Sequence, residues 1–370
     1  MKQKRWVSNN IGLRPELLVP RSAKEVLPKW LPKNTLLTSC ARHAIYQGCK
    51  ALGLKKGDGV LAPGFICNTV TLPMEKAGLR IHTFNLNKDL SIDWEDLLKN
   101  LKKGPKIKAL VWYHYLGIPI EFEKVRQFCK QHNLLFIEDC AHGLFTQING
   151  KPCGQGGDIA VFSIFKMIPV LHAGALVINN PKYRLKNKPK ALDLSQDYLD
   201  NLSHIELYRH QLYMQSQNSS SQVLRMGYKS FAKIAMKNQT QYDQIFKIDE
   251  VSRTVMLNVD PQKVRQTRAN NFKFYLKHFK DISVFKVLPN GACPLSFPIW
   301  TKERDALRKR IEAKGVEGLT YWPDYLLPKG AMKKHPNSKW LADSILSIPS
   351  HQDLGIDELN YVSQTLKECL

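Results

Sequence analysis

Residues 107–142 read IKALVWYHYLGIPIEFEKVRQFCKQHNLLFIEDCAH, and this stretch decides the fold class. Ile107–Tyr113 and Leu134–Ile137 are apolar runs, and the segment between them, Glu121–His132, has the character of a helix. Parallel strands are joined through a crossover of a dozen or more residues, usually a helix, so the stretch predicts a strand–helix–strand unit. Strands this apolar are typical of a parallel sheet that helices cover on both faces.

The same alternation of apolar runs and helix-like segments extends to both sides of this stretch. We expect strands at Val60–Ala62, Ile81–Phe84, Ile159–Ser163 and Ala175–Ile178, and helices at Thr69–Ala77 and Trp94–Leu101. Asn149-Gly150 is a strong turn signal, because both residues tolerate positive φ. This order predicts an α/β fold with a large, mixed and mostly parallel sheet.

A second, smaller unit is expected towards the C-terminus. Its predicted elements are helices at Val264–Phe279, Glu303–Lys314 and Ile356–Leu366 and strands at Ser296–Trp300 and Leu346–Pro349. Residues 183–255, between the two units, are polar and rich in Gln, Ser, Asn and Lys, which indicates helices and connections. We therefore predict a large domain over residues 1–250, with an N-terminal arm and this polar segment, and a small α+β domain over residues 251–370.

The 370-residue chain is strongly basic, with 55 Lys and Arg against 32 Asp and Glu and a formal net charge of +23. Such a balance favours anionic partners, which include nucleic acid, an anionic membrane surface and phosphorylated small molecules. The basic residues are spread along the chain, and no zinc-finger, RNP-type or basic-zipper pattern accompanies them. We therefore expect small-molecule partners and no specific nucleic acid.

The eight cysteines form no C-x-x-C pair, and several lie inside apolar runs, where a free thiol behaves as a small hydrophobe. No apolar run of about 18 residues is present, so no membrane span is expected. Met1–Asn10 is basic and polar, and no apolar segment of the kind found in secretory signals follows it. These features predict unpaired thiols, no metal site and a cytoplasmic protein.

The first candidate site is Phe136-Ile137-Glu138-Asp139-Cys140-Ala141-His142, in which an apolar strand ends in two acids, small residues and a histidine. In open α/β sheets, ligands bind beyond the carboxyl ends of the strands, so Asp139 is well placed for a buried cationic partner. In the alternative, structural interpretation, Asp139 caps the N-terminus of a helix.

The second candidate site is Phe162-Ser163-Ile164-Phe165-Lys166, where a lysine follows an apolar strand. Desolvation disfavours the ammonium form of a lysine in apolar surroundings, and a neutral amine is a nucleophile that forms a Schiff base with an aldehyde. In the alternative interpretation, the stem of Lys166 packs against apolar residues and its amine reaches water.

Together these segments supply what pyridoxal phosphate requires: a Schiff-base lysine, an acid for the pyridinium nitrogen and a phosphate cradle. Thr38–Ala44 supplies the cradle, because its small residues open a helix whose free backbone N–H groups can bind an anion. Ser163 could donate a further hydrogen bond. We therefore predict pyridoxal phosphate as the cofactor, with Lys166 carrying it and Asp139 holding its ring nitrogen.

Leu37–Asn180 resembles the DegT/StrS family of pyridoxal-phosphate-dependent sugar aminotransferases, in a branch with a Gly-Arg-x-Ala opening and an Arg-Lys-x-x-Pro-Val segment. The matching residues are Ala41–Ala44, Leu52–Asp58, Ala62–Cys67, His114–Gly117, Ile137–His142, Gly157-Asp158, and Phe162-Ser163 through Lys166 to Gly174. Further similarity lies at Pro294–Trp300, Tyr321-Trp322-Pro323 and Ile348–Gln352. The resemblance therefore covers most of the chain and leaves out the polar segment.

The resemblance implies a fold-type-I homodimer that transfers an amino group from an amino-acid donor to a keto sugar, linked to a nucleotide, in polysaccharide biosynthesis. The implied catalytic residues are Lys166, Asp139 and His142. His142 stands where the family usually places a glutamine that contacts the ring hydroxyl. The implied cofactor contacts are these three residues together with Ala41, Arg42, Cys67, His114 and Ser163.

Four positions differ from the usual family pattern. Ala41 replaces a glycine, Cys67 replaces an aromatic residue, Lys166 lies closer to Ser163 than usual, and His172-Ala173-Gly174 replaces an acidic residue and two glycines. Two alternatives stay open at this point. One is a sugar dehydratase of the same fold, in which a histidine replaces the lysine. The other is a non-catalytic protein of this fold that regulates or binds nucleic acid.

Overall fold

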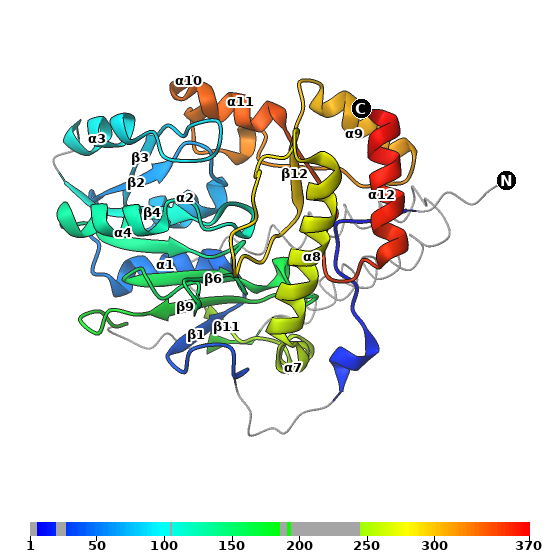
Figure 1. Cartoon of the computed structure of the whole chain (residues 1–370). Helices are drawn as coiled ribbons and strands as arrows, with labels where there is room; N and C mark the ends of the chain where they lie inside the picture. The colour runs from blue at the N-terminus through cyan, green and yellow to red at the C-terminus, as the bar shows by residue number, and fades with distance from the viewer. Residues whose placement is uncertain (1–5, 20–26, 104–105, 186–190, 194–244) are drawn as a thin grey trace.

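The computed structural model describes residues 6–19, 27–103, 106–185, 191–193 and 245–370, and its centre is a seven-stranded sheet (Figure 1). In the order in which they lie side by side, the strands are β1 (Thr35–Thr38), β9 (Gly174–Ile178), β8 (Ile159–Ser163), β5 (Leu135–Asp139), β4 (Ile107–Tyr113), β2 (Gly59–Pro63) and β3 (Arg80–Phe84). The five strands from β8 to β3 are parallel, whereas β9 and β1 each pair antiparallel with their neighbour. The predicted mixed, mostly parallel sheet is confirmed.

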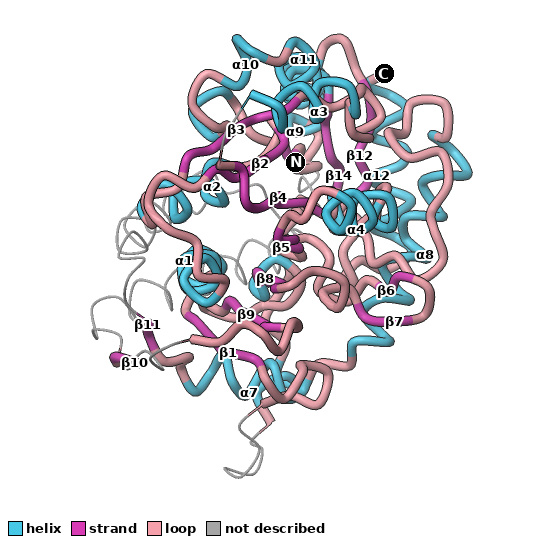
Figure 2. Tube along the Cα trace, turned by 90° about the vertical axis from the view of Figure 1, so that its left-hand side faces the viewer, coloured by secondary structure: helices cyan, strands magenta, loops and turns pink. Residues whose placement is uncertain are grey.

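Helices cover both faces of this sheet, because its parallel strands return through crossover helices. α1 (Ala41–Ala51) and α2 (Asn68–Lys76) lie on one face, and α3 (Trp94–Lys103) and α4 (Phe122–Gln131) lie on the other (Figure 2). The strands between them form the core, and Leu61 of β2 has no exposed surface. The two-sided covering explains why the strands are apolar on both faces.

A second, three-stranded antiparallel sheet lies in the C-terminal part of the chain (Figure 1). Its strands are β12 (Phe297–Trp300), β14 (Ile345–Ile348) and β13 (Leu319–Thr320), in this order, and the helices of this part are α8 (Pro261–Phe279), α9 (Arg304–Ala313) and α12 (Ile356–Cys369). α9 ends before Gly315, which has a φ of 87° and so closes the helix in the left-handed conformation that glycine favours.

The N-terminal arm contacts this second unit. Val7 forms a parallel bridge with Val316, and Ser8 Oγ and the backbone N–H of Asn9 donate to Glu317 Oε2 at 2.7 and 2.8 Å. Farther along the arm, the backbone N–H of Gly12 donates to a carboxylate of the same unit. The N-terminal arm, which the sequence assigned to the large domain, therefore also packs against the C-terminal unit. The domain boundary between residues 250 and 251 stays a prediction.

The remaining described elements are short. They are η1 (Pro15–Leu18), η2 (Tyr115–Gly117), β6 (Gln147–Ile148), β7 (Lys151–Pro152), η3 (Ile164–Lys166), β10 (Ala191–Leu192), β11 (Ile245–Phe246), α7 (Glu250–Asn258), η4 (Asp324–Leu326), α10 (Ala331–Lys334) and α11 (Pro336–Ser344). The predicted turn is confirmed between β6 and β7, where Asn149 and Gly150 have φ values of 51° and 77°. Most of the polar segment 183–255 lies outside the described residues.

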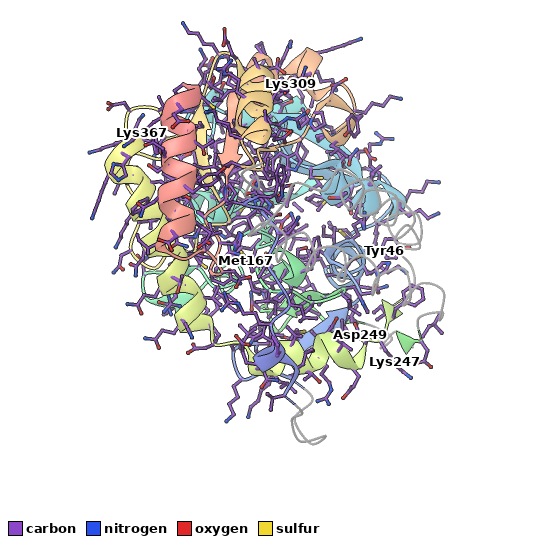
Figure 3. The ribbon with its side chains drawn as sticks, turned by 90° about the vertical axis from the view of Figure 1, so that its right-hand side faces the viewer. Tyr46, Met167, Lys247, Asp249, Lys309 and Lys367 are labelled. Atoms are coloured by element: carbon purple, nitrogen blue, oxygen red, sulfur yellow. The ribbon has the colours of Figure 1, made fainter. Side chains whose placement is uncertain are left out.

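Lysines spread over the surface account for part of the basic charge, as Lys309 on α9 and Lys367 on α12 illustrate (Figure 3). All eight cysteines lie within the described ranges and none forms a disulfide, which confirms the predicted unpaired thiols. Within the described ranges, every helix is too short or too polar to cross a bilayer.

Candidate active site

The carboxyl ends of three neighbouring strands meet the N-terminus of α1 around a cavity of about 190 Å³, which we call the inner cavity. Its lining residues from these strand ends are Tyr113, Asp139 and Ser163. The other lining residues are Cys40, Ala41, Arg42, Ile45, Cys67, Thr69, Val70, Ala141, Phe165 and Lys166. Six of the eight predicted cofactor contacts therefore surround one cavity, at the edge of the sheet where ligands of α/β proteins bind.

Asp139 is buried in this cavity with one carboxylate oxygen unsatisfied. Its Oδ1 accepts the backbone N–H of Ala141 at 2.9 Å, and its Oδ2 has no hydrogen-bond partner among the described residues. Burial raises the pKa of Asp139 to about 6, against the lowering effect of the Ala141 N–H and the charge of Lys166. No helix begins after Asp139, so the helix-cap interpretation is wrong. A buried, unpaired carboxylate oxygen requires a donor from a ligand.

Lys166 ends the single turn η3, directly after β8, and its Nζ lies 2.9 Å from Nε2 of His142. Burial, the largest effect, lowers the pKa of Lys166, although the nearby charge of Asp139 opposes this; the charge of Arg42 adds a smaller lowering. Burial, together with the charge of Lys166, also holds the pKa of His142 well below its usual value. Both shifts disfavour protonation of this hydrogen-bonded pair, so the site favours the neutral form of the Lys166 amine.

The ring orientation of His142 assigns the proton of this hydrogen bond. Its Nδ1 accepts the backbone N–H of Leu116 at 3.3 Å, which leaves the ring proton on Nε2. Nε2–H then donates to the lone pair of the Lys166 amine. The ring of His142 also contacts Tyr113 edge-on at 4.7 Å between ring centroids and stacks on Trp322 at 6.2 Å. These contacts fix the imidazole that positions the amine.

The N-terminus of α1 forms the cradle predicted for an anion. Cys40 at the N-cap makes no side-chain hydrogen bond to the helix, so the first backbone N–H groups stay available for a ligand. Gly174 of β9 lies directly against this turn, and a Cβ there would stand 2.3 Å from the carbonyl carbon of Cys40 and 2.5 Å from the nitrogen of Ala41. The family usually has two glycines at positions 173 and 174. This chain has Ala173 and keeps Gly174, the position where the contact with Cys40 and Ala41 leaves no room for a Cβ.

These features fit pyridoxal phosphate. The orphaned Oδ2 of Asp139 suits a protonated ring nitrogen, the neutral amine of Lys166 suits a carbonyl carbon, and the N-terminus of α1 with Arg42 suits a phosphate. Cys67 lines the cavity where the family usually has an aromatic residue. Its thiol accepts from Thr69 Oγ1 at 3.0 Å.

A second cavity of about 410 Å³, which we call the outer cavity, shares Phe165 and Lys166 with the inner one. It is lined by Asn9, Asn10, Ile11, His142, Pro169, Arg268, Leu295, Ser296, Glu317, Leu319, Thr320, Tyr321, Trp322 and Leu326. Trp322 has a φ of 43°, a left-handed conformation that is strained for a bulky residue and is often found at binding sites. Lys166 thus lies where the inner and outer cavities meet, and its amine can be reached from both.

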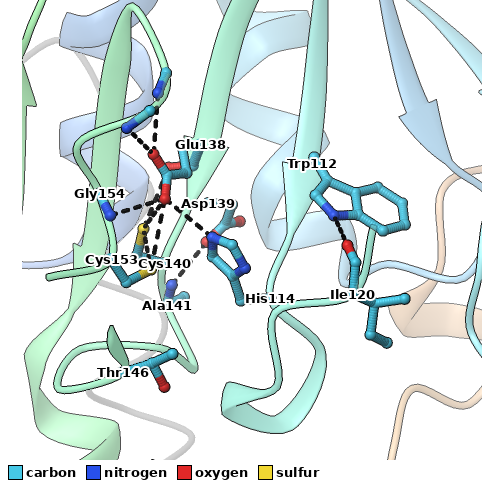
Figure 4. Close-up of polar contacts among 12 residues, drawn as sticks. Trp112, His114, Ile120, Glu138, Asp139, Cys140, Ala141, Thr146, Cys153 and Gly154 are labelled. Atoms are coloured by element: carbon cyan, nitrogen blue, oxygen red, sulfur yellow. Dashed lines mark hydrogen bonds and ion pairs between the residues drawn. The ribbon is translucent and has the colours of Figure 1, made fainter. Parts of the chain in front are cut away.

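His114 lies behind the site and lines neither cavity. Its Nε2 pairs with Glu138 Oε1 at 3.0 Å, and the three backbone N–H groups of Gly154, Gly156 and Gly157 also donate to Glu138 (Figure 4). Although burial opposes ionisation, these bonds hold the pKa of Glu138 at about 2. Because Glu138 immediately precedes Asp139, this network fixes the end of β5, and His114 acts through it.

Cys140 and Cys153 complete this buried network, with their Sγ atoms 3.0 Å apart and both within 3.6 Å of Glu138 Oε1 (Figure 4). These two thiols, His114 and Glu138 are donor types that bind zinc. Glu138 is already satisfied by backbone donors. Among the described residues, His114 Nδ1 has no outer partner of the kind that metal-binding histidines almost always have. We therefore treat the cluster as a hydrogen-bonded support for the site.

His172 also lies away from both cavities. Its Nδ1 is 3.1 Å from Asp249 Oδ2, and the neighbouring Leu171 N–H donates to Ser252 Oγ at 3.1 Å. These contacts join the segment after Lys166 to the start of α7. The histidine beside the reactive amine is thus His142, and His172 does not occupy the place of a substituted lysine.

The sequence analysis missed several lining residues. Tyr113 ends β4, so the strand-end rule that found Asp139 could also have found it. Its hydroxyl is buried without a partner among the described residues, and burial raises its pKa well above the usual value. By contrast, no local signal marks Asn9, Asn10 or Arg268, because only the packing of the arm and α8 brings them to the outer cavity.

Comparisons with known proteins agree with this arrangement. The model of the DegT/DnrJ/EryC1/StrS aminotransferase family matches residues 31–202. GDP-perosamine synthase of Vibrio cholerae is 29% identical over 164 residues, covering 42% of this chain and 44% of that protein. The chain therefore spans less than half of that relative's length in the match. GDP-perosamine synthase of Escherichia coli O157:H7 is 22% identical over 338 residues, covering 88% of this chain and 82% of that protein.

A solved structure extends the likeness of the fold to nearly the whole chain. Helicobacter pylori PseC, an aminotransferase involved in the biosynthesis of pseudoaminic acid, superposes with a TM-score of 0.67 at 15% identity, covering 92% of this chain and 88% of that one. Strand order, site geometry and family model agree. Residues 31–202 of the chain match the DegT/DnrJ/EryC1/StrS aminotransferase family, and the solved structure extends the likeness of the fold over most of the chain.

Proposed function

We propose that the protein is a pyridoxal-phosphate-dependent aminotransferase that passes an amino group from an amino-acid donor to a nucleotide-linked keto sugar. The observation that carries the proposal is the position of Lys166, a buried amine at the junction of two cavities, with the Oδ2 of Asp139, unpaired among the described residues, in the inner one. Because the pKa of this amine is lowered, more of it is unprotonated, and the unprotonated amine can act as a nucleophile and as a base.

In this proposal, Lys166 holds pyridoxal phosphate covalently, Asp139 keeps its ring nitrogen protonated, and Ala41, Arg42 and Ser163 bind its phosphate. The cofactor supplies an electron sink that makes a proton on the substrate carbon removable. Lys166, once free, takes that proton and returns it to a neighbouring carbon.

His142 and its aromatic neighbours support this chemistry. The Nε2–H of His142 orients the lone pair of Lys166, and Tyr113 and Trp322 hold the imidazole in place. Because burial lowers the pKa of Lys166, its amine releases a proton more easily than an exposed lysine does before it reacts.

The acceptor is inferred from the relatives and the outer cavity. The relatives from Vibrio cholerae and Escherichia coli are named for a GDP-linked sugar, and a Campylobacter jejuni relative, 22% identical over 354 residues, is a transaminase of a UDP-linked one. A volume of about 410 Å³ suits a sugar unit, and the basic surface favours an anionic nucleotide. We further propose a homodimer in the cytoplasm, where the free thiols would stay reduced.

The test begins with the purified protein and pyridoxal phosphate. We expect a visible absorbance band that borohydride removes, with the label on the peptide containing Lys166. L-Glutamate should then bleach the band of the unreduced protein, and a nucleotide-linked keto sugar should restore it. A label on another lysine would remove the assignment of Lys166. Release of a dehydrated sugar instead of an amino sugar would establish the dehydratase alternative.

A further inference from the structure

Arg268 of α8 is a buried cation that the proposed chemistry does not use. Only 1% of its surface is exposed. Its Nε donates to Gln352 Oε1 at 2.6 Å, and its Nη1 donates to the carbonyl oxygens of Pro294 at 3.0 Å and Leu295 at 2.9 Å. Its Nη2 donates to none of the residues that the structure describes. One edge of the guanidinium is therefore left for a ligand.

Among the described residues, Arg268 has no counter-ion within ion-pair distance. Its three hydrogen-bond partners are a neutral amide and two carbonyl groups. Asp353 influences it only over a longer range, and that carboxylate is already bound by Arg14 at 2.8 Å and by the backbone N–H of Gly12 at 2.7 Å. Buried charges in proteins are normally paired, so an unpaired guanidinium indicates that an anion is supplied from outside.

Arg268, whose Nη2 is free among the described residues, lies at the outer cavity. Arg268 lines the outer cavity together with Lys166, and two further polar groups, Ser296 Oγ and Tyr321 OH, line the same wall and lie 3.0 Å apart. These hydroxyls add donors that an anion could share with Arg268. The outer cavity thus holds a small built anion site on the same side as the reactive amine.

A direct chain of hydrogen bonds connects Arg268 to the reactive lysine's own segment. Gln352 accepts from Arg268 through Oε1 and donates through Nε2 to the carbonyl oxygen of Met167 at 3.0 Å. Met167 follows Lys166 in sequence and lies inside the molecule with no exposed surface (Figure 3). The position of the guanidinium is therefore fixed relative to Lys166 through one amide side chain.

We propose that Arg268 binds the α-carboxylate of the amino-acid donor. This inference rests on the proposed aminotransferase function. An amino acid must place its α-carbon beside Lys166, and its carboxylate is attached to that same carbon, so a carboxylate receptor has to share the cavity with the amine. Arginine suits this ligand because its hydrogen bonds to a carboxylate are charge-assisted, and Nη2 of Arg268 keeps its two N–H groups for them.

The diphosphate of the acceptor fits this wall less well. Arg268 offers one free nitrogen, whereas a diphosphate carries about two charges and several oxygens that require donors. Glu317 also lines the outer cavity, and because its repulsion grows with the charge of the ligand, it disfavours a doubly charged group more than a single carboxylate. The nucleotide is therefore expected to lie elsewhere, and Arg268 to distinguish substrates by their carboxylate.

The experiment compares Arg268→Gln, Arg268→Lys and the control Arg265→Gln, which removes a charge from the same helix outside both cavities. Calorimetry on each holoenzyme measures the affinity for 2-oxoglutarate, the keto acid that corresponds to L-glutamate, and for UDP. We expect R268Q to weaken 2-oxoglutarate binding by roughly 10- to 100-fold and to leave UDP binding unchanged, as expected for loss of a charged hydrogen bond. R268K should lose less, and R265Q should change neither affinity.

Three results would overturn the proposal: unchanged 2-oxoglutarate affinity in R268Q, equal losses for 2-oxoglutarate and UDP, or a loss for UDP alone. If R268Q does not fold, R268K carries the test, with the KM for L-glutamate expected to rise while the KM for the sugar stays constant. Failure of the proposed function would be recognised separately, in the unaltered protein. That protein would bind the cofactor but transfer no amino group from L-glutamate, L-glutamine or L-aspartate. That outcome would remove the role of Arg268 as well.

Discussion

The Nζ atom of Lys166 and the Nε2 atom of His142 lie 2.9 Å apart, and His142 Nδ1 is occupied by the backbone N–H of Leu116. With Nδ1 acting as an acceptor, the imidazole proton lies on Nε2 and is donated to the lone pair of the Lys166 amine. Family relatives usually place a glutamine at the position of His142. An amide can also accept from Leu116 and donate to Lys166, so the position accommodates both side chains.

The first prediction concerns His142. His142→Gln should keep the rate at which pyridoxal phosphate attaches to Lys166 within a few-fold, because the amide replaces both hydrogen bonds. His142→Ala should slow attachment by roughly tenfold or more, since the amine loses its orienting donor. Absorbance recorded after mixing apoprotein with cofactor measures both rates. Equal rates in all three proteins would show that His142 does not position the amine.

The second prediction concerns Asp139. Asp139→Asn keeps the shape of the side chain but removes the negative charge that keeps the ring nitrogen protonated. Turnover should fall by several orders of magnitude, much more than the affinity for the cofactor. The half-reaction with L-glutamate and a cofactor titration measure the two effects, with Asp58→Asn, a loop carboxylate, as the control. Near-normal turnover would reduce Asp139 to a structural residue.

The third prediction concerns Gly174. A Cβ at this position would lie 2.3 Å from backbone of Cys40, so Gly174→Ala should push β9 and the start of α1 apart. The affinity for pyridoxal phosphate should fall by at least roughly tenfold, because the phosphate cradle is displaced. Gly355→Ala is the matched control, since its Cβ would meet only the end of the flexible Glu358 side chain. Unchanged cofactor affinity in G174A would contradict the cradle.

The fourth prediction concerns pH and the contact between His172 and Asp249. Asp249 lies at the start of α7 (Figure 3). Burial opposes ionisation of Asp249, but the hydrogen bonds from His172 and Ser252 lower its pKa below 3.8. A carboxyl group with a depressed pKa stabilises the fold above its unfolded value and loses that contribution as pH falls through its folded pKa. Asp249→Asn should therefore cost about 1–3 kcal/mol at neutral pH and less in acid.

Thermal or urea unfolding at several pH values measures this difference between the parent protein and D249N. Asp193→Asn is the control, because Asp193 and Lys247 form an exposed pair, whose contribution is expected to be small. A stability difference that grows as the pH falls would contradict the assignment of the depressed pKa to Asp249.

The fifth prediction concerns the net charge of +23. We expect DNA and RNA to bind weakly at low salt and to be released at physiological salt, because scattered cations bind phosphates only through counterion release. A titration at two salt concentrations measures this. Tight binding that survives physiological salt would favour a regulatory protein over a metabolic enzyme.

The sequence by itself determined six of the seven strands of the large sheet, the order of the strand–helix units and the two segments that hold Asp139 and Lys166. These features are local, since apolar runs, their lengths and the residues at their ends follow from short-range patterns. The antiparallel strand β1 was not predicted, because its four residues become a strand only by pairing with β9, far along the chain.

Only the tertiary structure decided which of the candidate residues act together. His114 and Cys67 carry similar signals in the sequence, yet packing turns His114 towards Glu138 behind the site and leaves Cys67 on the cavity wall. No local pattern marks Arg268, because its surroundings come from three separate parts of the chain. These are α8, the loop at Pro294 and the turn after β14 that contains Gln352. Burial and the absence of a counter-ion are properties of that assembly, and they decide its chemistry.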